Sequence, residues 1–253
     1  MSIPSVMTLS LDEIMNIIRS RYDVEVESVK IGSKTLNVLQ IKDMEEQILK
    51  KLEQSLGQTS GASDFMRPEQ LSDELLLQLM EMQWWTKIWE PSFVLALFME
   101  KTSPVPGHKV LEIGAGMGIV GVYAALCGHD VTISDISEDA LLFARAHTLM
   151  NGCPHVPVIA LDWRLPYTGR PFEMIIGSEV VYDRRTYDIL ISFLDQALAP
   201  GGTIFLAKNK DLKTPLFFEK LVNRFKFKQM VVKLTGGDSP MEVELYAIKR
   251  KGE

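Results

Sequence analysis

From residue 109 onward, short apolar runs alternate with longer amphipathic segments, and this alternation constrains the fold more than any other feature of the chain. The apolar runs are "KVLEI", "DVTIS", "VPVIAL", "FEMIIG" and "GTIFLA". The segments between them include "IVGVYAALCG", "EDALLFARAHTLMNG" and "YDILISFLDQALA". Strands of about five residues separated by amphipathic helices are typical of βαβ units around a buried parallel sheet. We therefore predict five parallel strands with helices on both faces.

The C-terminal part of the chain predicts a different pairing. "KFKQMVVKL" and "MEVELYAIKR" alternate, or nearly alternate, in polarity around "TGGDSP". This pattern predicts an antiparallel pair at the edge of the sheet. The expected fold is therefore α/β, with a Rossmann-like sheet of seven strands, of which five are parallel and two form the antiparallel pair.

The first third of the chain does not show this alternation of apolar runs and amphipathic segments, so we predict an N-terminal appendage over residues 1–83 and a Rossmann-like domain over residues 84–253. "YDVEVESVKIGSKTLNVLQI" alternates in polarity on both sides of "GSK" and predicts a β-hairpin. "DMEEQILKKLEQSLG" and "PEQLSDELLLQLMEMQWW" predict amphipathic helices.

Composition narrows the classes of partner. The net charge of −6 at pH 7 gives no basic footprint, so we expect no nucleic-acid partner. The N-terminus does not resemble a signal peptide, and the apolar run "FVLALFM" is far shorter than the ~20 residues of a membrane helix. We therefore expect no membrane association.

Cysteine and histidine spacing provides no metal signature. Cys127 and Cys153 share no short spacing with each other or with a histidine, which argues against a disulfide framework and a zinc site and favours the reducing cytoplasm. The histidines also lack metal-ligand spacing, so we expect no metal and place them at the surface or in turns: His108, His129, His147 and His155.

The first chemical motif is "VLEIGAGMGIVG", in which a strand leads through glycines into a helix. Glycines there let backbone amides and the positive helix terminus approach a ligand. Gly116, Gly118 and Gly121 also fit G-x-G-x-x-G, so a dinucleotide site is an alternative, as is a tight turn without a ligand.

Carboxylates at the ends of the first three strands strengthen the case for a nucleotide. Glu112 lies inside an apolar strand and needs a polar partner, either a ligand amine or backbone amides. Asp135 ends the second strand and could hold both ribose hydroxyls, because Ser137 is the better cap for the next helix. Asp162 and Trp163 end the third strand and suit an adenine.

The fourth strand ends in "IGSEVVYD", which brings Ser178, Glu179 and Tyr182 to the same edge of the sheet. Glu179 and Tyr182 are either a catalytic pair or the polar end of a buried strand, with Tyr182 packed on the next helix. Asp183 is expected to cap that helix.

Together, "LEIGAGMGIVG", "ISD", "LDW", "GSEVVYD" and "APGG" resemble class I, seven-strand S-adenosylmethionine-dependent methyltransferases. "LDW" followed by an acidic-x-x-Tyr motif resembles the protein-lysine methyltransferase branch, methyltransferase family 16. The resemblance covers roughly residues 84–250. The family usually has Asp at the position of Glu179.

The resemblance implies S-adenosylmethionine as cofactor and a protein substrate, most simply a lysine. Glu179 would orient the amine or accept its proton, and Tyr182 would support Glu179. Asp135 would hold the ribose, and Trp89 would border the cofactor unless it only packs in the core. The implied cofactor-binding set is Trp89, Glu112, Gly114, Ala115, Gly116, Asp135, Asp162, Trp163 and Ser178.

Three other functions stay open at this point: a small-molecule methyltransferase, an NAD-dependent oxidoreductase and a cofactor-binding module without catalysis. Glu112, "LDW" and the lack of a Tyr-x-x-x-Lys set argue against NAD. The lack of an Asn/Asp-Pro-Pro-Tyr motif argues against methylation of nucleic-acid bases.

Overall fold

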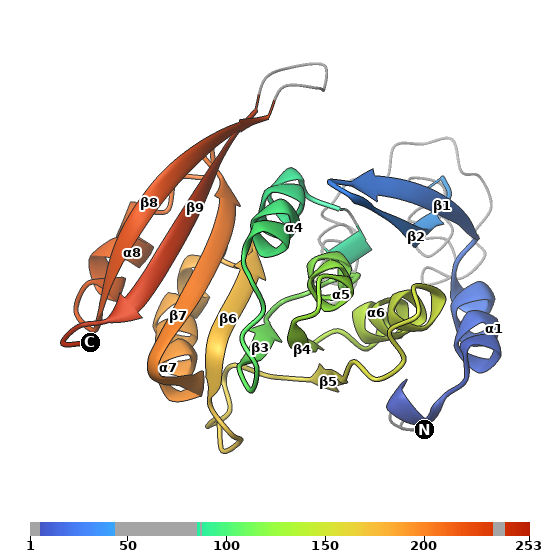
Figure 1. Cartoon of the computed structure of the whole chain (residues 1–253), viewed down its shortest axis with the longest axis horizontal. Coiled ribbons are helices and arrows are strands. Elements are labelled where there is room, and N and C mark those ends of the chain that lie inside the picture. The colour runs from blue at the N-terminus through green and yellow to red at the C-terminus, as the bar shows by residue number, and fades with distance from the viewer. Residues whose placement is uncertain (1–5, 44–84, 87, 235–240) are drawn as a thin grey trace, which may run out of the picture.

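A seven-stranded sheet forms the centre of the computed structural model, which describes residues 6–43, 85–86, 88–234 and 241–253. Its order is β5-β4-β3-β6-β7-β9-β8 (Figure 1). Strands β3 to β7 pair in parallel, while β9 is antiparallel to both β7 and β8. The predicted sheet is confirmed. The strand bounds are β3 (Lys109–Glu112), β4 (Asp130–Asp135), β5 (Val158–Ala160), β6 (Phe172–Ser178), β7 (Leu198–Asn209), β8 (Phe225–Leu234) and β9 (Met241–Arg250).

Helices cover both faces of this sheet (Figure 1). One face packs against α4 (Glu90–Lys101), α5 (Ile119–Leu126) and α6 (Glu138–Met150), and the other against α7 (Tyr187–Ala197) and α8 (Pro215–Leu221). Successive strand residues point to opposite faces. Ile176 of β6 accordingly joins the apolar cluster under α4 to α6, while Ile175 joins the cluster under α7 and α8.

The order of the strands determines where a ligand can bind. The chain starts in the middle of the sheet at β3, moves outward to β4 and β5, and then returns to β6 on the other side of β3. In an open α/β sheet, ligands bind at the carboxyl ends of the strands beside such a reversal. The loops after β3 and β6 therefore flank the expected site.

The N-terminal segment contains a helix and the predicted hairpin. α1 (Leu11–Arg21), which we did not predict, begins with a capping box between Ser10 and Glu13. The hairpin strands are β1 (Val24–Ile31) and β2 (Lys34–Ile41), joined through Gly32 and Ser33. The helices predicted in residues 43–57 and 68–85 lie outside the described residues, apart from Asp43 and Trp85.

This segment packs directly on the helices of the sheet. The Tyr123 hydroxyl of α5 donates to the carbonyl of Ile31 at 2.8 Å. Asn37 donates its N–H to the Asn151 side chain at 2.8 Å, and that side chain donates back to the Asn37 carbonyl at 2.9 Å. Apolar residues of α1 and β2 belong to the same cluster as the face under α4 to α6. The hairpin is therefore bonded to the helices at several points.

His147, expected at the surface or in a turn, is buried within α6, so that prediction is wrong for His147. His129 is also buried, but it lies in the turn between α5 and β4, as the prediction allowed. Nε2 of His147 accepts the N–H of Leu39 at 2.8 Å, so Nδ1 carries the proton and donates to the Met117 carbonyl at 2.8 Å. His147 thus joins the hairpin to the glycine-rich loop. His129 bonds the Met99 carbonyl at 3.1 Å.

The burial of His147 predicts a pH-dependent stability. Burial lowers its pKa to about 4 from an ordinary value of 6.5. The unfolded chain therefore binds a proton here between pH 6.5 and 4 that the folded protein does not bind. Above pH 6.5 the neutral, buried His147 makes its full contribution to the free energy of unfolding. As pH falls from 6.5 to 4, the free energy of unfolding decreases by on the order of 3 kcal/mol. We expect His147→Gln to lack this loss, as measured by urea unfolding of both proteins between pH 4 and 7. A difference between their unfolding free energies that is constant with pH would contradict the assignment.

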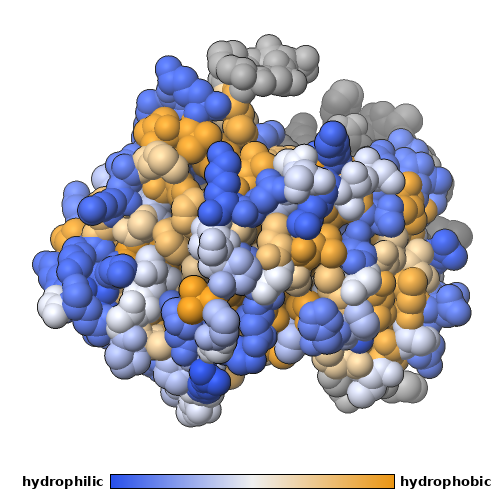
Figure 2. Space-filling view, viewed as in Figure 1, coloured by the Kyte–Doolittle hydropathy of each residue, from blue (hydrophilic) through white to orange (hydrophobic). Residues whose placement is uncertain are grey.

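The outer strand of the sheet is protected against pairing. β8 carries Lys226, Lys228 and Lys233 among exposed residues such as Met230, which is 52% exposed. Lysines on an edge strand oppose edge-to-edge association. Figure 2 shows hydrophilic and hydrophobic residues interspersed over one face of the molecule. Within the described ranges, no helix is long and apolar enough to cross a membrane.

Candidate active site

The glycine-rich loop after β3 depends on conformations and space that only glycine provides. Gly114 and Gly116 have φ values of +54° and +53°. A Cβ on Gly114 would lie 2.9 Å from a methyl of Val180, and one on Gly116 would lie 3.0 Å from the Trp85 carbonyl oxygen. The backbone of the loop is therefore closely packed between the segments before α4 and after β6, at the reversal of strand order.

Glu112 finds its polar partner within the protein. Only 3% of the residue is exposed, and its carboxyl accepts the N–H of Gly121 at 2.9 Å in the first turn of α5. Burial, with the nearby charge of Asp135 adding to it, raises the pKa of Glu112 to about 8. The sequence left two kinds of partner open for Glu112, a ligand amine or backbone amides, and the structure shows a backbone amide. Glu112 therefore bonds the first turn of α5, the helix that follows the glycine-rich loop.

Asp135 joins the glycine loop to the start of α6. Its two carboxylate oxygens accept the N–H groups of Gly116 at 2.8 Å and Ser137 at 2.9 Å. Burial raises the pKa of Asp135, and these amide hydrogen bonds oppose the rise. Ser137 caps α6, as predicted, by accepting the N–H of Ala140. The neighbouring Ile136 is 59% exposed, so an apolar surface adjoins the carboxylate at this edge.

Asp162 and Trp163 follow β5 as expected, but Asp162 already has a cation. The Arg164 guanidinium bonds both Asp162 oxygens at 2.7 to 3.0 Å, and the Arg164 N–H adds a bond at 2.9 Å. These bonds hold the pKa of Asp162 below its usual range. Trp163 lies over the glycine loop, since a Cβ on Gly114 would lie 3.4 Å from its indole ring. Asp162 can accept a hydrogen bond from an adenine only while it is also paired with Arg164.

The end of β6 lies next to the start of α4. The Ser92 hydroxyl of α4 donates to the Ser178 hydroxyl at 3.0 Å. Trp89 is the N-cap residue of α4 and is partly buried, so the structure brings it to the same edge of the sheet. Ser178 precedes Glu179 directly in the chain, and Trp89 lies three residues before the Ser92 that bonds Ser178.

Glu179 has an uncommon backbone conformation. Its φ of +55° is in the left-handed region, which non-glycine residues rarely adopt and which occurs often at functional sites. The turn directs its carboxylate onto β7, where Oε1 accepts the N–H of Asn209 at 2.5 Å. The backbone N–H of Glu179 donates to Ala207 at 2.9 Å. Burial raises the pKa of Glu179, while the Asn209 bond and the charge of Lys208 oppose the rise.

Tyr182 is exposed rather than buried under the following helix. It is 47% exposed, which leaves its ring accessible from solvent. Asp183 caps a short 3-10 turn, Arg184–Thr186, directly before α7, rather than α7 itself. Residues 180–183 connect β6 to this 3-10 turn, with Val180 and Val181 buried and Tyr182 exposed.

Two residues at the end of β7, close to Glu179, were not predicted from the sequence. Asn209 supplies the amide that holds Glu179, and Lys208 is buried beside it with only 4% of its side chain exposed. A signal for Lys208 was present, because "FLAKNK" places a charge at the end of an apolar strand, as "VLEI" does for Glu112. For Asn209 there was none, since any residue except proline donates this bond.

The residues at this edge fit a nucleoside-containing sulfonium cofactor. Backbone amides and tightly packed glycines follow β3, a carboxylate follows β4, and an indole with a carboxylate follows β5. Ile136 adds exposed apolar surface for a ring. Across the described ranges, no group of three or more His, Cys, Asp or Glu side chains is placed to hold a metal ion.

Comparison with known proteins identifies the family. A family model described as lysine methyltransferase matches residues 74–224, more than half of the chain. EEF1A lysine methyltransferase 3 of Mus musculus is 30% identical over 172 residues, which cover 65% of this chain and 72% of that protein. Protein N-lysine methyltransferase METTL21A of Danio rerio is 31% identical over 176 residues, 65% of this chain and 77% of that protein. Histone-arginine methyltransferase METTL23 of Homo sapiens is 31% identical over 142 residues, 51% of this chain and 67% of that protein.

Solved structures agree on the fold. A ribosomal protein L11 methylase from Lactobacillus delbrueckii subsp. bulgaricus has a TM-score of 0.52 at 23% identity, covering 65% of this chain and 81% of that one. The N-methyltransferase NodS from Bradyrhizobium japonicum, in complex with S-adenosyl-L-homocysteine, has a TM-score of 0.52 at 21% identity and covers 65% and 87%. Together with the family match, these similarities show that the chain belongs to the lysine methyltransferase family of S-adenosylmethionine-dependent enzymes.

Proposed function

We propose that this enzyme methylates a lysine side chain of a protein substrate at the edge of the sheet beside Glu179. The observation that carries the proposal is the placement of the Glu179 carboxylate. It lies at the reversal of strand order, in a left-handed turn, and is held by the Asn209 amide. The relatives named for N-lysine methylation support lysine as the acceptor.

The protein groups proposed to hold the cofactor lie at the ends of four strands, β3 to β6, and at the start of α4. Gly114, Ala115 and Gly116 would face its methionine end, Asp135 its ribose, and Trp163 with Asp162 its adenine. Glu112 would act indirectly, by accepting the hydrogen bond from Gly121 in the helix that follows the loop. Trp89 and Ser178 would border the sulfonium. S-adenosylmethionine supplies the methyl group, and its sulfur retains the electron pair of the broken S–CH₃ bond.

Glu179 is suited to preparing the acceptor nitrogen. An amine attacks only when it is neutral, and in-line displacement needs its lone pair directed at the methyl carbon. A half-buried carboxylate can accept an N–H bond from the amine and so fix its orientation, and then take up the proton released after transfer. Burial raises the pKa of Glu179, which makes it a stronger proton acceptor than an exposed glutamate. Tyr182, half-exposed three residues later, is proposed to support Glu179 through its hydroxyl and to face the cation that develops during methyl transfer.

We infer a cytoplasmic location for this activity. Cys127 and Cys153 are both free thiols, which fits a reducing compartment. The division into an N-terminal appendage over residues 1–83 and a catalytic domain over residues 84–253 stays a prediction.

A labelling experiment tests the proposed function. The protein is incubated with S-adenosylmethionine carrying a radioactive methyl group and with lysate from its source cells, and labelled proteins are analysed by mass spectrometry. We expect methyllysine in at least one protein band. Methylarginine would instead match the activity named for METTL23, and label found only in small molecules would contradict a protein substrate. Calorimetric titration with S-adenosylhomocysteine and with NAD should show binding of the first alone.

A further inference from the structure

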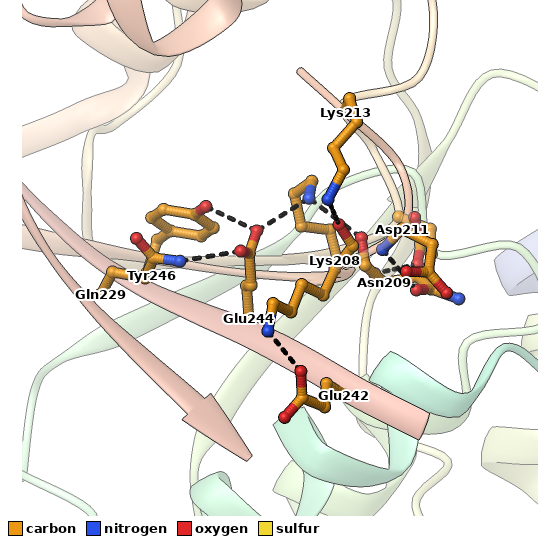
Figure 3. Close-up of polar contacts among 10 residues, drawn as sticks. Lys208, Asn209, Asp211, Lys213, Gln229, Glu242, Glu244 and Tyr246 are labelled. Carbon is orange, nitrogen blue, oxygen red and sulfur yellow. Dashed lines mark hydrogen bonds and ion pairs between the residues drawn. The ribbon is translucent and has the colours of Figure 1, made fainter. Parts of the chain in front are cut away.

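A buried ion pair lies directly behind the proposed acceptor site. The ammonium of Lys208 on β7 donates to the Glu244 carboxylate on β9 at 2.9 Å, and the two residues are opposite each other in the strand register (Figure 3). Their side chains are only 4% and 13% exposed. Removing two charges from water is costly, and apolar residues in their place are often equally stable or more so. Stability alone is therefore a weak explanation for this pair.

The anion of the pair is fixed by two further side chains. The Tyr246 hydroxyl donates to the Glu244 oxygen that binds Lys208, at 2.7 Å, and the Gln229 amide donates to the other oxygen at 2.8 Å (Figure 3). Glu244 is thus bonded from its own strand, from β8 and from β7. Because its anchor has little freedom to move, the ammonium of Lys208 is also held in one place.

Lys208 reaches Glu179 through the backbone of Asn209. Its ammonium donates to the Asn209 carbonyl at 2.9 Å, while the Asn209 N–H donates to the Glu179 carboxylate at 2.5 Å. Both backbone groups of Asn209 are therefore occupied, one by the buried cation and the other by the catalytic candidate. A shift of the ammonium would move the amide that locates Glu179.

The charges that face Glu179 come from two elements. Burial has the largest effect on its pKa and raises it, the positive charge of Lys208 on β7 lowers it, and the negative charge of Glu90 on α4 raises it. Lys213, in the loop after β7, faces Glu244 rather than Glu179. Lys208 is the cation that offsets the burial of Glu179.

We propose that Lys208 is a positioning residue for methyl transfer: its buried ammonium, anchored by Glu244, holds the Asn209 carbonyl, so that the backbone on either side of the Asn209 Cα is fixed and the Asn209 N–H keeps the carboxylate of Glu179 in place at the proposed acceptor end of the sheet. This inference rests on the proposed function of Glu179. It assigns to the Lys208–Glu244 pair a role in the geometry and charge of the acceptor site, without contact with the substrate.

Titration of Glu179 itself tests the inference independently of activity. The protein is labelled with ¹³C at glutamate carboxyl carbons, and the Glu179 signal is assigned by its loss in Glu179→Gln. We expect Lys208→Met to raise the titration midpoint of Glu179 by about one pH unit, because a nearby cation no longer favours the ionised form. Lys208→Arg, which keeps the charge, should shift it much less. A midpoint that is unchanged in folded Lys208→Met would overturn the inference.

Kinetic measurements give the second readout. At a pH below the Glu179 midpoint, Lys208→Met should lower kcat about tenfold, because a midpoint raised by about one pH unit leaves about one tenth of the ionised Glu179 there, with activity recovering at higher pH and the affinity for S-adenosylhomocysteine unchanged. Failure of the proposed function would appear as a wild-type protein without methyl transfer, in which the Glu179 midpoint still depends on Lys208. Loss of activity with an unchanged midpoint would instead remove Lys208 from this role.

Two further variants guard against misfolding and long-range charge effects. Lys208→Met leaves Glu244 buried without its cation, so the double variant Lys208→Met/Glu244→Gln removes both charges and should show the same midpoint shift in a stably folded protein. Lys210→Met serves as the matched control. Lys210 follows β7, pairs with Glu242 and is 41% exposed, so water screens its charge. Its replacement should leave the Glu179 midpoint and kcat near those of the wild type.

Discussion

Glu179→Gln is expected to lower kcat about 100-fold while leaving the affinity for S-adenosylhomocysteine unchanged. Glutamine has the same length as glutamate, and its carbonyl oxygen can still accept the Asn209 N–H. It cannot take up a proton, and proton transfer by a positioned side chain contributes about 10² to 10⁴ in rate. Steady-state kinetics with the methylated protein identified by the labelling experiment, together with calorimetry, measure both quantities.

Glu179→Asp separates the effect of the charge of Glu179 from the effect of its side-chain length. Glu179→Asp keeps the acid but is shorter by about 1.5 Å, one C–C bond, so it should lose the Asn209 bond, and its kcat should lie between those of the wild type and Glu179→Gln.

Tyr182→Phe removes the hydroxyl that is proposed to support Glu179. If Glu179→Gln and Tyr182→Phe both retained full activity, the catalytic roles of these residues would be wrong.

The pH profile should report the environment of Glu179. Because burial raises the pKa of Glu179, its ionised form is lost as pH falls through a value above that of an ordinary glutamate. The acid limb of kcat is therefore expected at a higher pH than a solvent-exposed glutamate would give, and it should be absent from the residual activity of Glu179→Gln.

Asp135→Asn is expected to raise the dissociation constant for S-adenosylhomocysteine about 100-fold. Each Asp135 oxygen accepts a backbone N–H, from Gly116 and from Ser137. Asparagine offers one acceptor oxygen, so its NH₂ group would face one of these two donors. The loss of one of these internal bonds would lower the stability of the loop. At the ribose, a cofactor hydroxyl that no longer bonds a charged carboxylate loses about 1.5 to 3 kcal/mol, or roughly 10- to 100-fold in affinity.

Asp130→Asn is the matched control for Asp135. Asp130 lies at the other end of the same strand, pairs with Lys109, and its side chain is 55% exposed. The same chemical change there should alter neither cofactor affinity nor the thermal midpoint by a measurable amount. Normal cofactor binding by Asp135→Asn, in a protein that melts like the wild type, would exclude Asp135 from the site.

The sheet could be predicted because its signals are local. β3 to β7 are short apolar runs between amphipathic helices, and burial on both faces follows from that pattern. The hairpin around Gly32 follows from alternation and a turn sequence. α1 could also have been predicted, because Ser10 and Glu13 form a capping box before an amphipathic run.

The errors arose where burial depends on distant segments. His147 is polar and lies in an amphipathic helix, so nothing near it in the chain shows that β2 and the glycine loop cover both of its nitrogens. The pairing of Asp162 with Arg164 is a different case: the two residues are only two positions apart, and their pairing was not predicted because it depends on how the chain turns after β5. Neighbours that determine burial and charge are set by packing, which a single sequence does not display.

The sequence by itself determined the α/β sheet, the edge of the sheet at which we propose the ligand binds and the residue types at that edge, because strand period, glycine spacing and strand-end carboxylates are local features of the chain. Only the tertiary structure decided what each of these groups bonds. It turned Glu179 back onto the Asn209 amide and gave Glu112 an amide partner in α5. It also placed the buried Lys208–Glu244 pair behind the acceptor site. The physical reason is that hydrogen bonds and pKa values depend on distances across strands far apart in sequence, whereas local pattern fixes only which face and which end of a strand a side chain occupies.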